Sequence, residues 1–269
     1  MGDYSHYDYL NVEVSDDGIA LITMNRPDKL NACTAEEHVE LPRILADIAE
    51  DDDVKVGVVT GAGRAFSVGG DIKLLERAID NPHDNLGNAL DDGRKLVLNH
   101  IDNDKPMIAA VNGIAMGTGA VLALYCDVVI ADRRAKIADG HIRAGIAAGD
   151  GGALLWPLTM GLTKAKRYLM TGDWITAEEA ERCGLVTEVV DDGTCLDRAM
   201  EYARRFAAGP QTAIRYSKRA MNQWLRLGVA WTFDYSLALE GLTMVTPDAK
   251  RALEQLKSEG RGIMPEDGA

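Results

Sequence analysis

Two glycine-rich stretches decide how this chain folds: Phe66-Ser67-Val68-Gly69-Gly70-Asp71-Ile72 and Asn112-Gly113-Ile114-Ala115-Met116-Gly117-Thr118-Gly119. Each follows a strand-like apolar run and precedes a stretch with helical character. The N-terminus of a helix presents unpaired backbone N–H groups, and glycines let a ligand approach them closely. Two such ends can converge on one oxygen atom. For either stretch taken alone, the alternative is that its glycines only permit a tight turn between strand and helix.

Strand-like and helix-like patterns alternate around these stretches. A rough period of two on both sides of the turn signal Ser15-Asp16-Asp17-Gly18, over residues 9–14 and 18–24, predicts a β-hairpin. Thr34 and Glu37 form a capping box, which predicts a helix with Pro42 inside it. Further strand-like runs cover residues 54–60, 107–111 and 128–131. The alternation predicts an α/β core.

From residue 163 onward the pattern is almost wholly helical, with a strand-like interruption at 184–190. The predicted helices cover residues 163–170, 176–183, 195–208, 210–224, 229–245 and 249–258, and Thr176 and Glu179 form a capping box at the start of the second. We therefore expect two parts, a core over residues 1–200 and a helical C-terminal region over residues 201–269.

Composition excludes several classes of protein. The chain has 269 residues with a net charge of -13, so it lacks the basic stripe that nucleic-acid binding needs. The first residues lack the apolar run of a signal peptide, and the longest apolar stretches are of strand length, so we expect a cytoplasmic protein without membrane association. The cysteines show no Cys-x-x-Cys spacing and the histidines are scattered, so we expect no metal site.

Two nucleotide-binding motifs are also absent. Gly61-x-Gly63 follows a strand-like run, but Phe66 stands where the dinucleotide-binding fingerprint requires its third glycine. No glycine cluster is followed by Gly-Lys and a hydroxyl residue, which excludes a P-loop.

Several motifs in order resemble the crotonase (enoyl-CoA hydratase/isomerase) superfamily. They are Asn25-Arg26-Pro27-x-x-x-Asn31-Ala32, then Gly61-x-Gly63-x-x-Phe66-Ser67-x-Gly69-Gly70-Asp71-Ile72, then Ala109-Ala110-Val111-Asn112-Gly113 with its glycine cluster and Cys126-Asp127. The spacing holds through Leu169-Met170-Thr171-Gly172 and on to Gly184-Leu185-Val186. The resemblance implies an α/β fold with a crotonase-like ββα spiral core, a C-terminal helical region used for trimerisation, and a homotrimer or homohexamer in which Trp224 and Trp231 supply part of the interface.

The resemblance also implies an oxyanion hole made by the backbone N–H groups of Val68 and Thr118. A thioester or ketone carbonyl that becomes an enolate gathers charge on oxygen, and preorganised donors stabilise that charge. The two glutamates with which hydratases of the family work fall at Val121 and His141 in this chain. Without these carboxylates we expect ordinary hydration of crotonyl-type substrates to be poor.

A histidine and an aspartate, His141 and Asp150, stand in their place. This pair resembles the dyad of the β-diketone hydrolases, crotonase relatives that cleave a carbon–carbon bond by a retro-Claisen reaction. His38 and Glu240 fit the same branch, whereas Thr118 stands where that branch has a further histidine. An imidazole with a carboxylate on its far nitrogen is a general base near neutral pH, which would make His141 the base and Asp150 the residue that orients it.

Each of these residues also has a structural alternative. Asp150 precedes Gly151-Gly152 and has the position of a helix N-cap. His141 alone has the alternative of a satisfied structural histidine. His38 lies beside acidic residues on a predicted helix, where it is either a surface or a site residue, and Glu240 is either a buried structural acid or a catalytic one.

In members that use coenzyme A (CoA), the family's cleft is lined by segments that correspond here to Arg26, Lys29, Gly69, Gly70, Asp71, Ile72 and Gly117. The resemblance implies CoA as part of the substrate and no other cofactor. Our leading hypothesis is an enzyme that stabilises the enolate of an acyl-CoA thioester. The alternatives are a CoA-independent β-diketone hydrolase and a non-catalytic crotonase-fold subunit.

Overall fold

The computed structural model describes residues 2–80 and 82–259, which form an α/β fold with two sheets. The strands are β1 Leu10–Val14, β2 Ile19–Met24, β3 Val56–Gly61, β4 Met107–Val111, β5 Ala115–Met116, β6 Val128–Asp132, β7 Lys136–Ala138, β8 Ile175–Thr176 and β9 Glu188–Val190. The six-stranded sheet has the order β1-β2-β3-β4-β6-β9, and the three-stranded sheet has the order β5-β7-β8. None of the helices in these residues combines the length and apolar character needed to cross a membrane.

The first two strands form the predicted hairpin, with Leu10 opposite Met24. β3, β4, β6 and β9 join it in parallel, and β3, β4 and the first four residues of β6 are buried along their length, as continuous apolar runs in parallel sheets are. Buried side chains on both faces of this sheet make up two apolar clusters.

The helices between and after the strands are α1 Ala35–Glu50, α2 Ile72–Asp80, α3 Pro82–Asp102, α4 Thr118–Leu124, α5 Gly152–Met160, α6 Leu162–Thr171, α7 Ala177–Cys183, α8 Cys195–Ala207, α9 Gln211–Met221, α10 Gln223–Gly228, α11 Asp234–Met244 and α12 Pro247–Glu259. Short 3-10 turns cover Pro27–Lys29 and His141–Ala144, and a π-helix covers Val229–Phe233. The Thr34 and Thr176 caps are confirmed, since each hydroxyl accepts a hydrogen bond from the N–H three residues on. Pro42 lies inside an unbroken α1.

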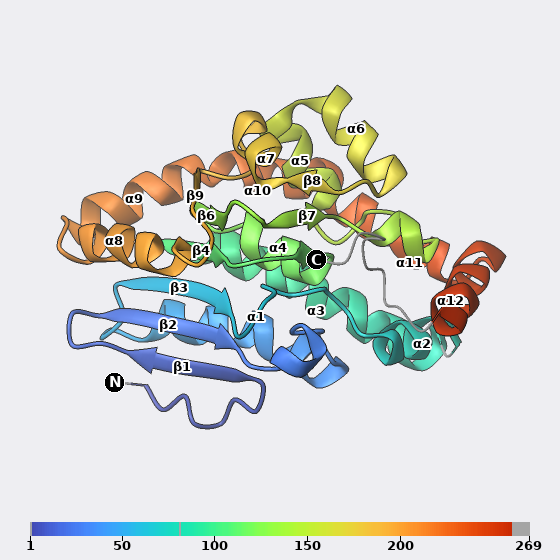
Figure 1. Cartoon of the computed structure of the whole chain (residues 1–269), viewed down its shortest axis with the longest axis horizontal. Coiled ribbons are helices and arrows are strands. Elements are labelled where there is room, and N and C mark those ends of the chain that lie inside the picture. Colours follow the sequence, from blue (N-terminus) through green and yellow to red (C-terminus); the bar gives the residue numbers. More distant parts are fainter. Residues whose placement is uncertain (1, 81, 260–269) are drawn as a thin grey trace.

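The last helices pack against helices from the first half of the chain. Figure 1 shows α12 beside α2, with α11 close by, and α12, α2 and the His141–Ala144 turn share an apolar cluster. The expected division after residue 200 falls inside α8, which packs on β3, β4 and β6. The two-part division therefore stays a prediction. Residues 260–269 of the expected C-terminal region lie outside the described residues.

Candidate active site

A small cavity lies where α11, α1, α2 and the two glycine-rich stretches meet. It has a volume of about 90 Å³. One wall is made of backbone and carries Val68, Gly69, Gly117 and Thr118, while another carries titratable side chains. Apolar side chains complete the lining: Leu74, Leu75, Ala78, Leu90, Met116, Ala144, Ile146, Leu237 and Met244.

The backbone wall forms because the two glycine-rich stretches touch. The N–H groups of Phe66 and Ser67 both donate to the Ile114 carbonyl at 3.0 Å, and the Met116 N–H donates to the Ser67 carbonyl at 2.9 Å. Gly69 has φ +79°, and a Cβ there would lie 2.6 Å from the Met116 carbonyl oxygen, so a glycine is required. Both stretches therefore line one cavity, and the convergence of their N–H groups on one oxygen stays a prediction.

The two N–H groups expected to form the oxyanion hole differ in whether another group of the protein already accepts their hydrogen bond. Thr118 is the first residue of α4, and within the described part of the chain no group accepts a hydrogen bond from its N–H. The Val68 N–H donates to the Leu30 carbonyl at 3.2 Å. Leu30 and the next residue, Asn31, both have positive φ, and Asn31 is anchored by hydrogen bonds to the Ala62, Ala65 and Phe66 carbonyls. A substrate oxygen must therefore share or displace this bond to use Val68.

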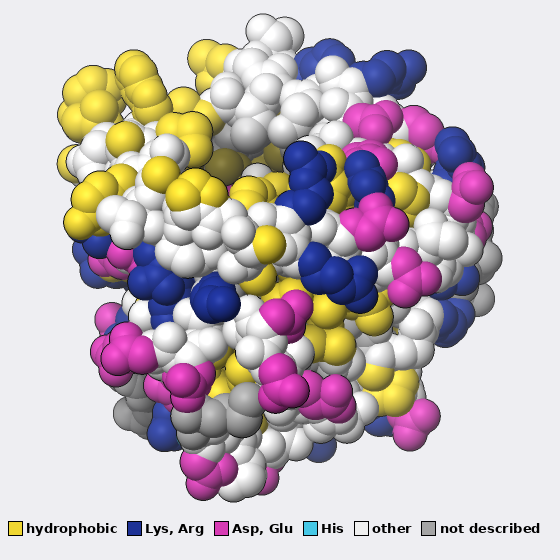
Figure 2. Space-filling view, turned by 90° about the vertical axis from the view of Figure 1, so that its left-hand side faces the viewer, with side chains coloured by type: hydrophobic (Ala, Val, Ile, Leu, Met, Phe, Trp, Pro, Cys, Tyr) yellow, Lys and Arg dark blue, Asp and Glu magenta, His cyan; other side chains and the backbone are white. Residues whose placement is uncertain are grey.

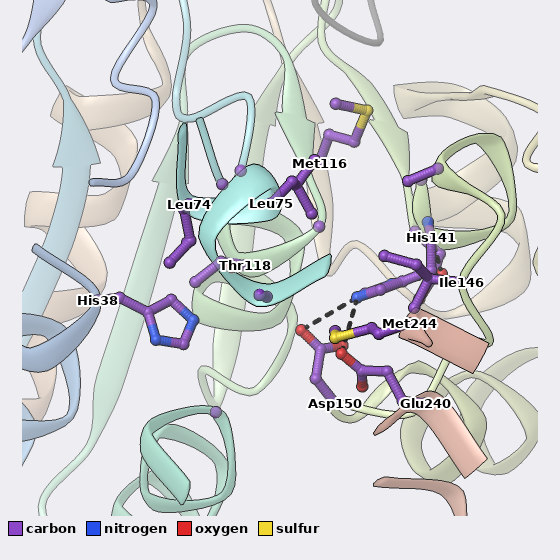
Figure 3. Close-up of a pocket in the computed structure, with 18 of the residues that line it drawn as sticks. His38, Leu74, Leu75, Met116, Thr118, His141, Ile146, Asp150, Glu240 and Met244 are labelled. Atoms are coloured by element: carbon purple, nitrogen blue, oxygen red, sulfur yellow. Dashed lines mark hydrogen bonds and ion pairs between the residues drawn. The ribbon is translucent and has the colours of Figure 1, made fainter. Parts of the chain in front are cut away.

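His141 lies among three carboxylates, of which Figure 3 labels Asp150 and Glu240. Its Nδ1 is 2.8 Å from Asp139 Oδ1, and its Nε2 is 3.4 Å from Asp150 Oδ2 and 3.9 Å from Glu240 Oε1. The residue on the far nitrogen is therefore Asp139, not Asp150 as expected from the sequence. Asp150 and Glu240 share the Nε2 side, where Asp150 Oδ1 and Glu240 Oε2 have no hydrogen-bond partner among the described residues.

These contacts set the charges in the cavity. Burial alone lowers the pKa of His141, but the negative charges of Asp150 and Asp139 outweigh it and raise that pKa well above its ordinary value. Burial raises the pKa of Asp150, and the His141 charge more than reverses this, so the pKa of Asp150 is lowered. Burial raises the pKa of Glu240 to about 8. Near neutral pH the site holds an imidazolium, an Asp150 carboxylate and a neutral Glu240.

The glycines of Gly149-Asp150-Gly151-Gly152 make room for these carboxylates. A Cβ on Gly149 would lie 2.6 Å from Glu240 Oε2, and a Cβ on Gly152 would lie 2.2 Å from Asp139 Oδ2. The Ser236 hydroxyl donates to the Gly149 carbonyl at 2.9 Å, which ties α11 to this loop. The loop and α11 together therefore place Asp150 and Glu240.

His38 lies across the cavity from His141, on α1 (Figure 3). Its Nδ1 is buried without a hydrogen-bond partner among the described residues, and burial lowers its pKa, although the charges of Asp92 and Asp150 oppose this. His38 is thus a neutral imidazole lining the cavity, and the surface alternative is wrong.

A larger cleft of about 940 Å³ adjoins the cavity and shares Val68, Gly70, Leu75 and Met116 with it. Arg26, Lys29, Arg64, Lys73 and Arg77 contribute cationic side chains to its lining, together with Asp28, Glu36, Asp71 and Ile72. Five of the residues expected to contact CoA line this cleft, namely Arg26, Lys29, Gly70, Asp71 and Ile72, whereas Gly69 and Gly117 line the adjoining cavity.

Two cleft residues also have local structural contacts. Asp71 Oδ1 accepts a hydrogen bond from the Leu74 N–H at 2.8 Å and so caps the first turn of α2. The Arg26 guanidinium donates to the Ala32 carbonyl and lies 3.9 Å from the buried Glu37. The expected substrate contacts of these two residues stay predictions.

The structure rules out the helix-cap alternative for Asp150 and adds Asp139 to the site. The N-cap of α5 is Gly151 and has no side-chain capping bond, so the interpretation of Asp150 as a helix cap is wrong. Asp139, missed in the sequence, directly follows β7 and lies two residues before His141. Its spacing gives no periodic signal, because the Gly140 turn at φ +82° folds its side chain back onto His141.

Asp139, His141 and Asp150 offer ligand atoms within 4.8 Å of one another, as a metal site would. Here, however, each imidazole nitrogen already faces a carboxylate of opposite charge. The arrangement suits proton transfer, and the expectation of a site without a metal stays a prediction.

The family model described as enoyl-CoA hydratase/isomerase matches residues 15–255. The chain belongs to this family. A 1,2-epoxyphenylacetyl-CoA isomerase from Escherichia coli K12 is 36% identical over 208 residues, which cover 76% of this chain and 79% of the relative. The resemblance predicted from the motifs is thereby confirmed.

Solved structures of family members show the same fold. An enoyl-CoA hydratase/isomerase from Mycobacterium paratuberculosis superposes with a TM-score of 0.88 at 36% identity, covering 93% of this chain and 100% of that one. A β-diketone hydrolase from the cyanobacterium Anabaena sp. PCC 7120, bound to (S)-3-oxocyclohexyl acetic acid, has a TM-score of 0.82 at 32% identity, covering 90% and 96%. The predicted crotonase-like spiral is confirmed.

Proposed function

We propose that this enzyme acts on an acyl-CoA thioester by forming its enolate. One observation carries the proposal: a single cavity places the backbone wall of Val68 and Thr118 opposite the His141, Asp150 and Glu240 cluster, and opens into a cation-lined cleft. The cavity supplies the chemistry and the cleft accommodates the rest of a long anionic substrate.

The first step is loss of a proton from the carbon next to the thioester carbonyl. The Asp150 carboxylate takes this proton on Oδ1, the C–H electron pair forms the carbon–carbon double bond, and the carbonyl π electrons move to the oxygen. The Thr118 and Val68 N–H groups stabilise the oxyanion, and each such donor is worth about 3 kcal/mol of barrier. The sequence predicted His141 as the base and Asp150 as the residue that orients it. In this mechanism Asp150 is the base, because His141 is charged near neutral pH.

In a β,γ-unsaturated acyl-CoA this enolate is a dienolate, and in the second step Asp150 returns the proton to its γ carbon: the oxyanion electrons re-form the carbonyl, the enolate double bond moves to the α,β position, and the electron pair of the former β,γ double bond takes the proton. Such a transfer is an isomerisation, and it consumes no water. Val121 is buried where a hydratase has its first glutamate, and His141 stands at the position of the second, so both carboxylates of the water-activating pair are missing. Hydration of crotonyl-CoA is therefore expected to be slow.

Cations in the cleft support the choice of a CoA thioester. In a chain of net charge -13, five Lys and Arg residues line this cleft against three carboxylates, so its lining carries an excess of two positive charges. CoA carries several phosphate charges, and a local basic site attracts them despite the overall acidity. The Escherichia coli relative is itself named for a CoA compound.

A second candidate function is hydrolysis of a cyclic β-diketone without CoA. The observation in its favour is His38, a neutral imidazole that lines the cavity opposite His141 and so provides a polar contact for a second carbonyl. The Anabaena relative is named as a β-diketone hydrolase. In this case Asp150 and His141 would activate water for attack on one ring carbonyl.

A substrate panel separates these functions. Wild type and His141→Ala are supplied with crotonyl-CoA, a β,γ-unsaturated acyl-CoA, a 3-oxoacyl-CoA and a cyclic 1,3-diketone. We expect turnover of a CoA thioester other than crotonyl-CoA, strongly reduced in the variant. Turnover of the diketone alone supports the second candidate. No turnover and no retention of CoA would support a non-catalytic subunit and overturn both.

We further propose that the protein assembles as a trimer or a pair of trimers. Large apolar side chains are exposed on the C-terminal helices, among them Trp224 at 72% and Trp231 at 79% exposure. Figure 2 shows hydrophobic side chains gathered at one edge of the molecule. Burial of such a surface stabilises association. Sedimentation of wild type and Trp231→Ser measures the mass, and a monomeric wild type would contradict the proposal.

A further inference from the structure

We infer that Asp139 is a positioning residue: it holds the His141 ring through Nδ1, so that Nε2 faces Asp150 and the reacting end of the cavity with a proton on it. The inference rests on the proposed function for its catalytic consequence, because it concerns the same cavity. Its structural part stands on the contacts of Asp139 alone.

The contacts of the Asp139 carboxylate fix the ring from one side. Oδ1 accepts from His141 Nδ1 at 2.8 Å and from the His141 backbone N–H at 3.3 Å. The side chain of Asp139 is only 4% exposed, so water does not weaken the interaction. Oδ2 lies against Gly152, where any side chain would collide with it. The carboxylate is therefore confined between the imidazole and the start of α5.

The backbone of the same residue reaches the opposite wall. The Gly117 N–H is shared between the Asp139 carbonyl at 3.1 Å and the Ala138 carbonyl at 3.2 Å, and Gly117 has φ +51°. Gly117 directly precedes Thr118, whose N–H has no acceptor among the described residues. The segment that carries Asp139 therefore contacts both the imidazole and the turn that presents the oxyanion donor.

Two carboxylates on opposite nitrogens give the ring its charge. Asp139 faces Nδ1, and Asp150 and the neutral Glu240 face Nε2. His38 on α1 acts on Asp150 from across the cavity and also interacts with Asp92 on α3. Removing the Asp139 charge leaves a single ion pair at Nε2. His141 then loses its proton at lower pH, and the ring is free to rotate about its side-chain bonds.

The test is a titration of His141 in the full-length protein without substrate. Histidine NMR signals are followed against pH in wild type and Asp139→Asn, with the His141 signal assigned by its absence in His141→Ala. We expect the acid dissociation constant of His141 to rise at least tenfold in Asp139→Asn. An unchanged titration would overturn the inference.

A second variant keeps the aspartate but moves it. Gly152→Ala forces the Asp139 carboxylate away from its place, since the new Cβ would lie 2.2 Å from Oδ2. We expect a shift of the His141 titration in the same direction, so this variant provides the test if Asp139→Asn does not fold. Asp173→Asn is the control, because it removes a half-exposed surface carboxylate outside the cavity lining. An equal shift in the control would contradict a specific role for Asp139.

Activity then distinguishes positioning from a structural role. With the substrate identified by the panel, Asp139→Asn should lower kcat about 100-fold with KM changed less than threefold, and the alkaline limit of activity should move to lower pH. A rise in KM with unchanged kcat would overturn the positioning role. If the titration shifts as expected but wild type turns over no substrate, the proposed function fails while the assignment of Asp139 as the residue that holds His141 remains.

Discussion

The inner cavity and the outer cleft share several lining residues but differ in how they use charge. In the cavity, His141, Asp150 and Glu240 are buried and their pKa values are strongly perturbed by burial and by one another. In the cleft, Lys29 and Lys73 are exposed to solvent. Charges act strongly on one another where water is excluded and weakly where water surrounds them.

This difference separates two tasks within one site. Buried groups whose pKa values are pushed apart become distinct acids and bases, which is what a proton-transfer reaction requires. Exposed cations instead attract and orient an anionic substrate, and salt weakens that attraction. Substitutions in the cavity should therefore change kcat, and substitutions in the cleft should change KM.

Removal of the base should have the largest effect. In Asp150→Asn the cavity loses the carboxylate that accepts the proton, so kcat should fall 10²- to 10⁴-fold. The matched control is Asp28→Asn, which makes the same chemical change in the cleft and should alter kcat less than about threefold. Steady-state kinetics on both variants makes the comparison, and equal losses would remove the distinction between cavity and cleft.

Removal of one backbone donor should have the next largest effect. Thr118→Pro deletes the N–H at the first position of α4, where proline is compatible with a helix, and kcat should fall about 10²- to 10³-fold. Thr118→Ala keeps the N–H and serves as the control. Comparable activity of both variants, measured after their folding is verified by circular dichroism, would show that this N–H does not stabilise the oxyanion.

Stability should depend on pH through Glu240. Its pKa is raised to about 8 by burial, whereas the unfolded chain gives it an ordinary value near 4.5. The folded state therefore keeps a proton that the unfolded state releases, and between these values Glu240 makes stability fall by up to about 1.4 kcal/mol per pH unit as pH rises. Denaturant unfolding of Glu240→Gln should show a shallower fall between pH 5 and 8. An identical slope would mean that Glu240 is ionised in the native protein.

The cleft cations should have the smallest effect. Lys29→Ala and Lys73→Ala each remove one exposed charge, so KM for a CoA substrate should rise about two- to fivefold at low salt, and less at high salt. The rise should be absent for a substrate without the CoA phosphates. A fall in kcat with unchanged KM would place these lysines in the chemistry instead.

Much of the fold could be predicted from local sequence signals. The hairpin around residues 15–18 and the caps at Thr34 and Thr176 depend on neighbouring residues, and these predictions are confirmed. The helix α3 did not emerge from the pattern, and α5 emerged only as the alternative in which Asp150 caps a helix. α5 contains Pro157 and has a nearly uniform apolar composition, so it lacks the polar face that reveals a surface helix.

The site was predictable where motifs define it and not where tertiary contacts do. His141 and Asp150 follow from their positions in the family pattern, and the structure brings both into one cavity. The turn at Gly140 and the packing of α11 on the site decide which carboxylate faces which His141 nitrogen. Asp139 was therefore missed, and the role of orienting the ring was assigned to Asp150. The same applies to the Leu30 carbonyl on the Val68 N–H, a contact between loops that no local pattern encodes.

The most direct test of enolate formation is exchange of the substrate's own proton. Wild type and Asp150→Asn are incubated in deuterated water with acyl-CoA thioesters such as butyryl-CoA and phenylacetyl-CoA, and deuterium at the carbon next to the carbonyl is measured by mass spectrometry. The account predicts incorporation of deuterium that depends on wild-type enzyme and is lost in Asp150→Asn. Incorporation at the uncatalysed rate with every thioester that binds would contradict it.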